Sequence, residues 1–365
     1  MKKYVLLSLL AIGFINSFAT IRTVSNNPDQ PGQFTQVDAA IAASVAGDTI
    51  YVHGSQFTYN DFFVTKRLVI MGAGYNSNNQ FNLPTKVGSI WLNRDTGLQN
   101  ASGSVISGFL VTTNLRNNGN PGVENITIFR NQINSTLYTY NPSTGGNFGN
   151  NWVIYNNIIW SIAGGSSGST SSSASNITLQ NNIIMGDVNG FSMSSVLIDH
   201  NVFPGSDALS NLFYATITNN IFIRTTGNIL ASSVAFNTFN NNLSNLTTIG
   251  PNPPTNSFAG GGNTEAGNFI AVDPQFENVT NLNAFDYTFN YRLKTTSTVR
   301  NAGTDGTDLG IYGGARPFPS GGAAGSGYDT SPLPPIPQVT EVNILNSTLQ
   351  PGTPLNVNVK AKVNN

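Results

Sequence analysis

The amino-acid sequence predicts an all-β solenoid of stacked parallel coils, and two observations carry this prediction. The first is one pattern that recurs: a short run of alternating apolar and polar residues, then an Asn, then two apolar residues. It occurs at residues 125–133, 151–159, 176–184, 195–203 and 214–222, with a degenerate copy at 233–243. The second is a charged fraction of only 9%, against about 25% in ordinary soluble proteins.

The repeated Asn sets the length of a coil. The aligned residues follow one another at intervals of 26, 25, 19 and 19 residues, which suits a solenoid coil. Alternation rich in Ile, Val, Phe and Thr predicts a strand with one buried face, and Asn tolerates the left-handed backbone of a bend. We expect the stacked Asn side chains to form a structural hydrogen-bonded ladder, with about 4.8 Å between coils. These ladder residues are Asn131, Asn157, Asn182, Asn201 and Asn220.

The scarcity of charge fits the same stack. Each side chain of a parallel coil lies over its equivalent in the next coil, so repeated like charges would repel one another at about 5 Å. Residues 131–223 contain no Lys or Arg. The formal net charge is −1, which gives a nucleic-acid partner no electrostatic support.

The first residues indicate export. Lys2 and Lys3 precede an apolar stretch at 4–14, and residues 17–19 fit a small-x-small cleavage site. We therefore expect a signal peptide at 1–19, a mature chain that begins at Thr20, and a location outside the cell or on its outer surface. The chain has no Cys, which excludes disulfides and thiolate metal sites. No later segment suits a membrane-spanning helix.

The next segment predicts a cap and the first coils. Residues 34–45 have the apolar spacing of one amphipathic helix, which would cover the open end of the stack. Residues 46–54, a turn and a strand, and residues 66–75 follow. The run GDTIYVHG at 47–54 resembles the start of pectin-lyase-like right-handed parallel β-helix proteins. The resemblance implies a right-handed parallel β-helix of about ten coils, and it implies little about activity because many functions share this fold.

The strands at 87–92 and 104–112 continue as early coils. The second of these resembles a coil common in the same proteins. Polar stretches rich in Gly, Ser and Asn at 114–122, 141–150 and 162–175 are predicted to be loops that leave the coil on one side. A recognition surface is expected at these loops or on the strand face beside them.

The end of the solenoid also resembles this group of proteins. Residues 272–278, 286–293 and 301–314 match, in order and spacing, a closing segment of many secreted β-helix proteins. Residues 297–301 depart from that pattern by lacking an Asp, which weakens the case for a metal site near Asp305 and Asp308. The resemblance covers roughly residues 34–314, and we expect the β-helix domain to span 20–316.

The remainder is predicted to be a linker and a tail. Residues 317–337 form a linker rich in Pro, Gly and Ser. Residues 338–365 hold two alternating runs, 339–344 and 355–363, too short to fold alone. We expect this C-terminal β tail to pair onto an edge of the solenoid, with an attachment tail as the alternative.

Two sets of residues are candidates for a catalytic site. A polysaccharide lyase needs a basic group beside a uronate and a cation to neutralise the carboxylate. The basic residues that neighbouring early coils offer are Lys86, Arg94, Arg116 and Arg130, with Glu124 nearby in sequence. A glycoside hydrolase needs two carboxylates at a set separation. Neighbouring coils offer Asp187, Asp199 and Asp207, with His200 beside Asp199. Isolated charges on a solenoid and Asp at turns are usually structural, so we expect neither set to be catalytic.

The sequence therefore predicts a non-catalytic exported protein that binds carbohydrate or assembles with other cell-surface chains. Its alternative is a polysaccharide lyase or glycoside hydrolase. An ice-binding solenoid ranks last because the Thr rows are irregular. Trp91, Trp152 and Trp160 could stack on sugar rings, but we expect them in the core. We expect no cofactor and no metal.

Overall fold

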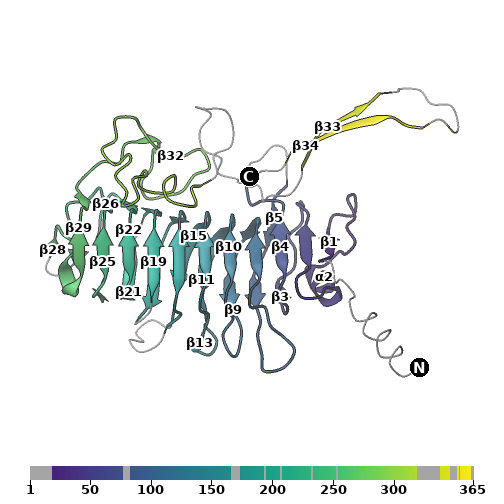
Figure 1. Ribbon diagram of the computed structural model, residues 1–365, viewed down its shortest axis with the longest axis horizontal. Coiled ribbons are helices and arrows are strands. Elements are labelled where there is room, and N and C mark those ends of the chain that lie inside the picture. The colour runs from purple at the N-terminus through teal and green to yellow at the C-terminus, as the bar shows by residue number, and fades with distance from the viewer. Residues whose placement is uncertain are drawn as a thin grey trace, which may run out of the picture.

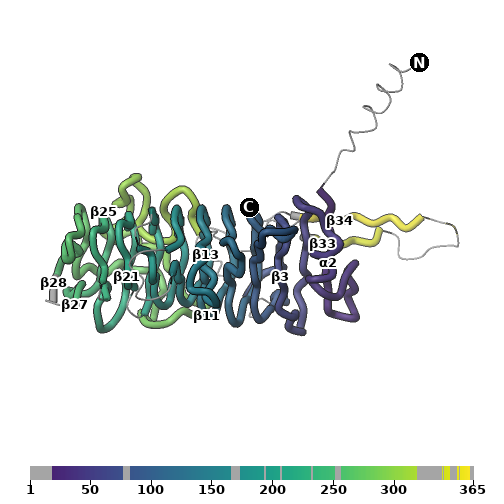
Figure 2. The backbone as a smooth tube through the Cα atoms, turned by 90° about the horizontal axis from the view of Figure 1, so that it is seen from below, coloured from purple at the N-terminus to yellow at the C-terminus, as the bar shows by residue number. Residues whose placement is uncertain are grey.

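A computed structural model describes residues 19–365 with gaps at 77–82, 166–172, 193–194, 206–207, 232, 252–253, 319–337, 346–351, 353 and 363–365. The described part is an all-β parallel β-solenoid of about nine turns, which confirms the predicted fold class at close to the expected ten coils. Figure 1 shows its coils stacked in chain order, and Figure 2 shows the same stack from below as successive loops of one tube. Residues 1–18 of the expected signal peptide lie outside the described residues.

One long parallel sheet, sheet A, runs along the described stack, with its strands in chain order. Its strands, in order, are β1 (Ile21–Val24), β2 (Thr49–Val52), β4 (Val69–Gly72), β7 (Val105–Ser107), β10 (Thr127–Phe129), β14 (Val153–Tyr155), β16 (Ile177–Gln180), β19 (Val196–Asp199), β22 (Thr216–Thr218), β25 (Thr238–Asn240) and β29 (Thr264–Ala266).

In the second sheet, sheet B, many turns contribute two short strands. In the turns of β11 and β15 these two strands are joined into one longer strand, which pairs with two strands of a neighbouring turn. Its strands are β3 (Phe62–Val64), β5 (Thr85–Val87), β6 (Ile90–Leu92), β8 (Phe109–Val111), β9 (Leu115–Asn117), β11 (Gln132–Tyr138), β15 (Ile158–Ala163), β17 (Ile183–Ile184), β18 (Val188–Phe191), β20 (Val202–Pro204), β21 (Leu209–Phe213), β23 (Ile221–Ile223), β24 (Val234–Ala235), β26 (Leu243–Ser244) and β30 (Phe269–Ile270).

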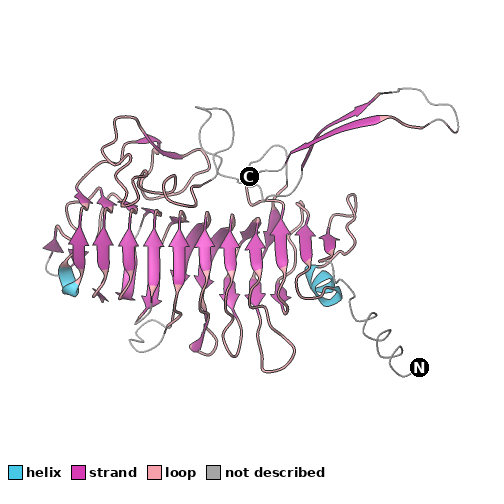
Figure 3. Ribbon diagram, in the orientation of Figure 1, coloured by secondary structure: helices cyan, strands magenta, loops and turns pink. Residues whose placement is uncertain are grey.

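The shorter elements lie at the ends and in the loops, and Figure 3 shows the two described helices at opposite ends of the stack. They are α2 (Val37–Ala43), the 3-10 turn η1 (Gly260–Gly262), and the hairpin pairs β12 (Tyr140–Asn141) with β13 (Gly146–Phe148), β27 (Gly250–Pro251) with β28 (Pro254–Thr255), β31 (Phe276–Asn278) with β32 (Asn290–Leu293), and β33 (Gln338–Ile344) with β34 (Val357–Lys362). Neither described helix is long and apolar enough to cross a membrane.

The N-terminal cap is shorter than the sequence suggested, α2 instead of 34–45, but it buries the expected face. Val37, Ala40 and Ile41 pack against the first coils. The Lys66 ammonium donates to the carbonyls of Ile41, Ala42 and Ser44 at 3.0, 2.9 and 2.6 Å. A cation at the end of a helix satisfies carbonyls that have no partner within the helix, so Lys66 fixes the cap to the coil below it.

Strand β9 corrects the loop predicted at 114–122. Leu115 is fully buried in sheet B and pairs with Ile90 on one side and Leu137 on the other. One inward Leu among Asn, Arg and Thr is enough for a strand here, because the neighbouring coils supply both hydrogen-bonding partners. The predicted loop at 141–150 contains most of the β12–β13 hairpin.

The solenoid has two hydrophobic cores. The first fills the coils with the inward side chains of both sheets. The second lies outside the coils, between sheet B and the closing segment, defined here as residues 272–318. The two apolar residues after each repeat Asn divide between these cores: Ile183 faces out and Ile184 faces in. Figure 1 shows the closing segment lying along one side of the later coils, next to β26 and β22.

The tail forms a hairpin of its own. Strands β33 and β34 pair antiparallel with each other and with no strand of the two described sheets, so the expected pairing onto an edge of the solenoid is absent from the described residues. Figure 1 draws the hairpin apart from both sheets.

Candidate functional site

The corner between sheet A and sheet B contains two adjacent columns of polar residues. The inner column is the Asn ladder. Asn131, Asn157, Asn182, Asn201 and Asn220 each donate the backbone and side-chain N–H to the side-chain oxygen of the next ladder residue at 2.8–3.1 Å. Asn242 and Asn268 extend it by two coils. These side chains are not available to bind a ligand, because their donors and acceptors are hydrogen-bonded within the coils.

The residue before each ladder Asn, and not the ladder Asn itself, has the left-handed backbone. Asn156, Asn181, His200, Asn219 and Asn241 all have φ between 51° and 61°. This corrects the role assigned from the sequence, where one Asn was expected both to bend the chain and to form the ladder. The structure divides these tasks between consecutive residues, which explains the Asn-Asn pairs of the repeat.

The left-handed column holds the closing segment against the solenoid. Asn181 donates its side-chain N–H to the carbonyls of Ile311 and Gly313 at 3.0 and 2.8 Å. Asn156 and Asn241 donate in the same way to Arg316 and Ala302 at 2.9 and 2.8 Å. This column therefore holds residues 302–316 against the solenoid. The repeat pattern in the sequence does not distinguish it from the ladder.

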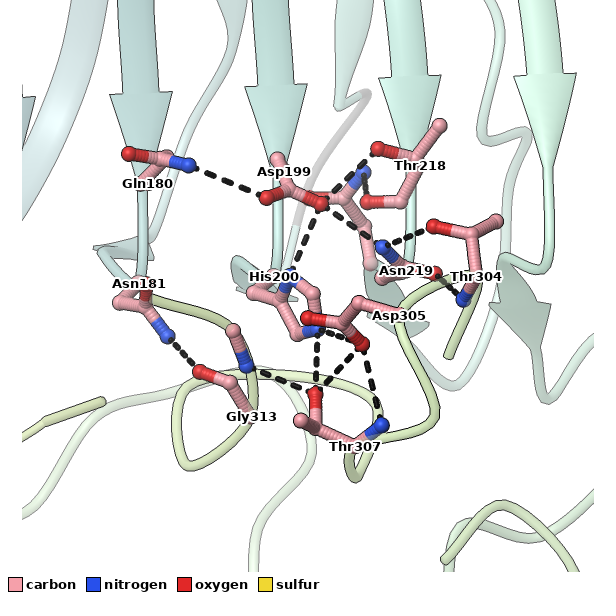
Figure 4. Close-up of polar contacts among 12 residues, drawn as sticks. Gln180, Asn181, Asp199, His200, Thr218, Asn219, Thr304, Asp305, Thr307 and Gly313 are labelled. Atoms are coloured by element: carbon pink, nitrogen blue, oxygen red, sulfur yellow. Dashed lines mark hydrogen bonds and ion pairs between the residues drawn. The ribbon is translucent and has the colours of Figure 1, made fainter. Parts of the chain in front are cut away.

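Asp199 and His200 occupy this corner, where Figure 4 shows them between the strand ends and the closing segment. His200 Nδ1 lies 2.8 Å from Asp199 Oδ1, and the Thr218 hydroxyl and the Asn219 amide donate to the same oxygen at 2.8 and 2.9 Å. The other oxygen accepts from Gln180 Nε2 at 3.1 Å. Both oxygens of Asp199 are therefore occupied by donors from three coils.

The other side of the imidazole meets the closing segment. His200 Nε2 lies 3.1 Å from the Thr307 hydroxyl and 3.7 Å from Asp305 Oδ1. The Thr307 hydroxyl accepts the Gly314 N–H at 2.8 Å and donates to Asp305 Oδ1 at 2.7 Å. The ring of His200 thus lies between two carboxyl groups, with Nδ1 hydrogen-bonded to Asp199 and Nε2 facing Thr307 and Asp305.

The same contacts shift the two carboxyl groups. Burial opposes the charged form of Asp199, but the hydrogen bond and charge of His200, with Asn219 and Thr218, outweigh burial and lower its pKa below the usual 3.8. Burial likewise opposes the charge of Asp305, and the Thr307 hydroxyl and N–H together with His200 lower its pKa.

A carboxylate, an imidazole and a hydroxyl in this order can activate the hydroxyl as a nucleophile, but the contacts in this corner do not leave the hydroxyl and the imidazole available for that reaction. His200 is 1% exposed, and the Thr307 proton is committed to Asp305. The buried imidazole therefore offers a substrate almost no surface. We define Asp199, His200, Asp305 and Thr307 as the clasp, a structural connection between sheet A and the closing segment.

The remaining sequence candidates do not converge. Asp187 follows β17 and accepts hydrogen bonds from Ser210 and Asn189 at 3.0 and 3.1 Å, on sheet B and away from the corner that holds Asp199. Asp207 lies outside the described residues. Asp187 and Asp199 therefore do not form a carboxylate pair.

The basic residues are distributed over a loop, sheet B and a corner. Arg94 lies 3.5 Å from Glu124. The Arg116 guanidinium lies 4.3 Å above the Trp91 ring on sheet B, and Arg130 is the left-handed residue after β10, 6.0 Å from the Phe129 ring. Lys86 lies exposed on β5. These residues do not form one cluster, and the described residues contain no group of three or more His, Asp and Glu that could hold a metal ion.

A groove of about 350 Å³ lies where the closing segment crosses sheet B. Its floor comes from β11, β15 and Met185, which follows β17, and its roof comes from residues 283–285 of the closing segment. The lining residues are Gln132, Ile133, Asn134, Ile158, Trp160, Met185, Asn283, Ala284 and Phe285. We call this the Trp160 groove. Its volume is within the usual range of about 300–1,000 Å³ for small-molecule sites.

Two hydrogen-bonded anchors hold the roof in place. Asn283 donates to the Thr225 hydroxyl at 2.6 Å and accepts the Thr225 N–H at 3.1 Å. The Tyr287 hydroxyl bonds to Gln132, and burial raises the pKa of Tyr287 to about 12. Gln132 also donates to Asn134 at 2.8 Å. The groove is therefore preformed, with amide groups on two sides.

The three tryptophans have three different environments. Trp152 is fully buried, as expected, and donates to the Val123 carbonyl at 2.8 Å. Trp91 is half-buried between Phe63 and Arg116. Trp160 is 53% exposed in its groove, so the expectation of a core position is wrong for this residue. The three consecutive apolar residues at 158–160 indicate that at least one of them faces outward, because side chains alternate between the two faces of a strand.

No family model matches the chain, and no curated protein is significantly similar to it.

Proposed function

We propose that this chain is an exported, non-catalytic β-helix protein of pectin-lyase-like type that binds carbohydrate in the Trp160 groove. The observation that carries the proposal is Trp160 itself: a large aromatic ring left 53% exposed in a concave, preformed groove. Exposed large apolar groups within grooves mark interaction sites. The signal-like residues 1–19 support export to the cell surface or beyond.

The chemistry of the lining favours a sugar over other ligands. The ring of Trp160, with Ile158, Met185 and Phe285, offers an apolar surface to the C–H face of a sugar. The amides of Gln132, Asn134 and Asn283 offer donors and acceptors to hydroxyl groups. The described lining has no charged residue, so it provides no cation for an acidic substrate and no carboxylate pair for hydrolysis.

The test is retention of the mature chain (20–365) on insoluble polysaccharides: cellulose, chitin, mannan and pectin, with and without Ca²⁺. We expect retention on at least one neutral polysaccharide and a loss of about ten-fold in affinity for Trp160→Ala, the size expected for removal of a central aromatic anchor. Phe57→Ala is the matched control, since Phe57 is 47% exposed and lies outside the groove.

The same assay tests the alternative of a polysaccharide lyase or glycoside hydrolase. Absorbance of unsaturated products and release of reducing ends would report turnover. Turnover that Arg116→Ala or Asp199→Asn removes would contradict the proposal, and so would retention that Trp160→Ala leaves unchanged.

A further inference from the structure

The corner that precedes sheet A has an unusual pair of residues. In three coils its left-handed residue is an Asn: Asn125, Asn151 and Asn176, with φ of 58°, 61° and 54°. In two later coils the same position holds Tyr214 and Phe236, with φ of 57° and 59°. Asn adopts this backbone readily, whereas a bulky aromatic residue with positive φ is an outlier.

These aromatic rings do not contribute to the core. Tyr214 and Phe236 are each 56% exposed, and their rings stack on one another at 5.5 Å with 12° between their planes. Strain that a protein retains without a packing gain is a reason to infer function. The two rings form a flat apolar surface across neighbouring coils.

A second groove begins at this surface. It has a volume of about 400 Å³ and crosses β16, β19 and β22 of sheet A. Its lining residues are Asn176, Ile177, Thr178, Ser195, Val196, Leu197, Tyr214 and Thr216. We call this the Tyr214 groove. Hydroxyl and amide groups alternate with the apolar floor of Leu197, and the described lining contains no charged residue.

From these features we infer that the Tyr214 groove is a second carbohydrate site, and that the protein is bivalent and bridges two neutral polysaccharide chains. The inference rests on the proposed function of the Trp160 groove and extends it. A neutral chain is the occupant that fits, because the rings offer a stacking surface, the Asn, Ser and Thr side chains match hydroxyl groups, and an acidic chain would find no cation in the described lining.

Bivalency follows from the placement of the two grooves. The Tyr214 groove lies on sheet A beside the corner where its strands begin, and the Trp160 groove lies on sheet B beyond the corner where those strands end. They have no lining residue in common. One bound chain therefore leaves the other groove free for a second chain, and the rigid coils keep the two sites at a fixed separation.

The experiment uses protein bound to an insoluble polysaccharide that retains the wild type, to which fluorescent soluble fragments of that polysaccharide are added. Wild-type protein is expected to capture the fragments on the solid. The double variant Tyr214→Asn with Phe236→Asn should lower this capture at least ten-fold and keep retention on the solid through Trp160. Asn stands at this position in three earlier coils, so the variant should keep the left-handed backbone. Circular dichroism of the variant checks that it folds. Phe57→Ala is the control.

The outcomes separate the two claims. A wild type that no neutral polysaccharide retains overturns the proposed function and with it this inference. A wild type that is retained but captures no more fragment than the solid alone overturns bivalency only. So does a double variant that captures as much fragment as the wild type. If the double variant instead loses self-association in sedimentation experiments, the aromatic pair is an interface between copies, and the inference is wrong.

Discussion

At each corner between sheets A and B, two consecutive side chains satisfy different partners. The first has a left-handed backbone and points to the closing segment, as Asn181 does toward Ile311 and Gly313. The second is buried and continues the ladder, as Asn182 does toward Asn201. A buried amide nitrogen without a partner would be destabilising by about 1–3 kcal/mol, so these hydrogen bonds hold both side chains in place.

His200 stands where its neighbours in the outer column, Asn181 and Asn219, have Asn, and it introduces ionisable contacts with the closing segment. Its ring joins Asp199 of sheet A to Asp305 and Thr307 of the closing segment. The pKa values of Asp199 and Asp305 are both lowered in the folded chain. A carboxyl group whose pKa is lower in the folded chain than in the unfolded chain stabilises the fold at pH values above its unfolded pKa. This stabilisation is lost as the pH falls through the folded pKa.

We therefore predict that stability to urea decreases when the pH falls below the usual carboxyl value of 3.8. Asp199→Asn should be less stable than the wild type at neutral pH, because the buried carboxylate that bonds to His200, Thr218 and Asn219 is then lost. Its stability should also depend less on pH in the acid range. Urea unfolding followed by fluorescence at several pH values measures both effects. An Asp199→Asn variant with the same acid dependence as the wild type would contradict the clasp.

At the scale of elements, the closing segment is the part that completes the molecule. It covers the outward residues of the repeat, among them Ile158, Ile183 and Ile221, and so forms the second core. Gly310 packs directly against this second core. A Cβ there would lie 2.8 Å from Ile221 Cδ1, and its φ of 77° already disfavours other residues.

We predict that Gly310→Ala loosens the closing segment and leaves the solenoid folded. Limited proteolysis should then cleave within 272–318 at a higher rate, with unchanged far-ultraviolet circular dichroism. The matched control is Gly306→Ala, which has a similar φ of 79° but no atom within 4 Å of the added Cβ. Equal cleavage rates in the two variants would show that backbone strain, and not the packing of Ile221, explains the effect.

The elements also show what the sequence could predict. Repeat strands and ladder residues follow from local patterns, because each coil repeats the same physical problem of alternate burial and a polar corner. The closing segment follows only from its resemblance to the end of other secreted β-helix proteins. The short strand β9 was predicted as a loop, since one buried Leu115 in a polar run is too weak a pattern. The left-handed column was assigned to the wrong Asn of each pair, because sequence alone does not distinguish which of two consecutive asparagines bends the chain.

For the whole molecule, the candidate site was harder to predict than the fold. The catalytic candidates were chosen by proximity in sequence, and the structure distributes them over different faces. The Trp160 groove instead joins residues 132–134, Ile158, Trp160 and Met185 to residues 283–285. Only the docking of a distant closing segment creates this cavity, so no local pattern contains it. The neutral lining agrees with the low charge of the whole chain.

The central claim is that a sugar binds against Trp160, and the quenching of tryptophan fluorescence tests it most directly. The chain has three Trp residues, of which Trp152 is buried and Trp160 is 53% exposed. Soluble fragments of the retained polysaccharide are added to the wild type and to Trp160→Phe, and acrylamide quenching is measured with and without them. We predict that the fragments protect the wild type from quenching, because the sugar covers the exposed ring. Trp160→Phe should still bind but show no such protection. Equal protection in both proteins, or none in a wild type that binds the fragments, would contradict the account.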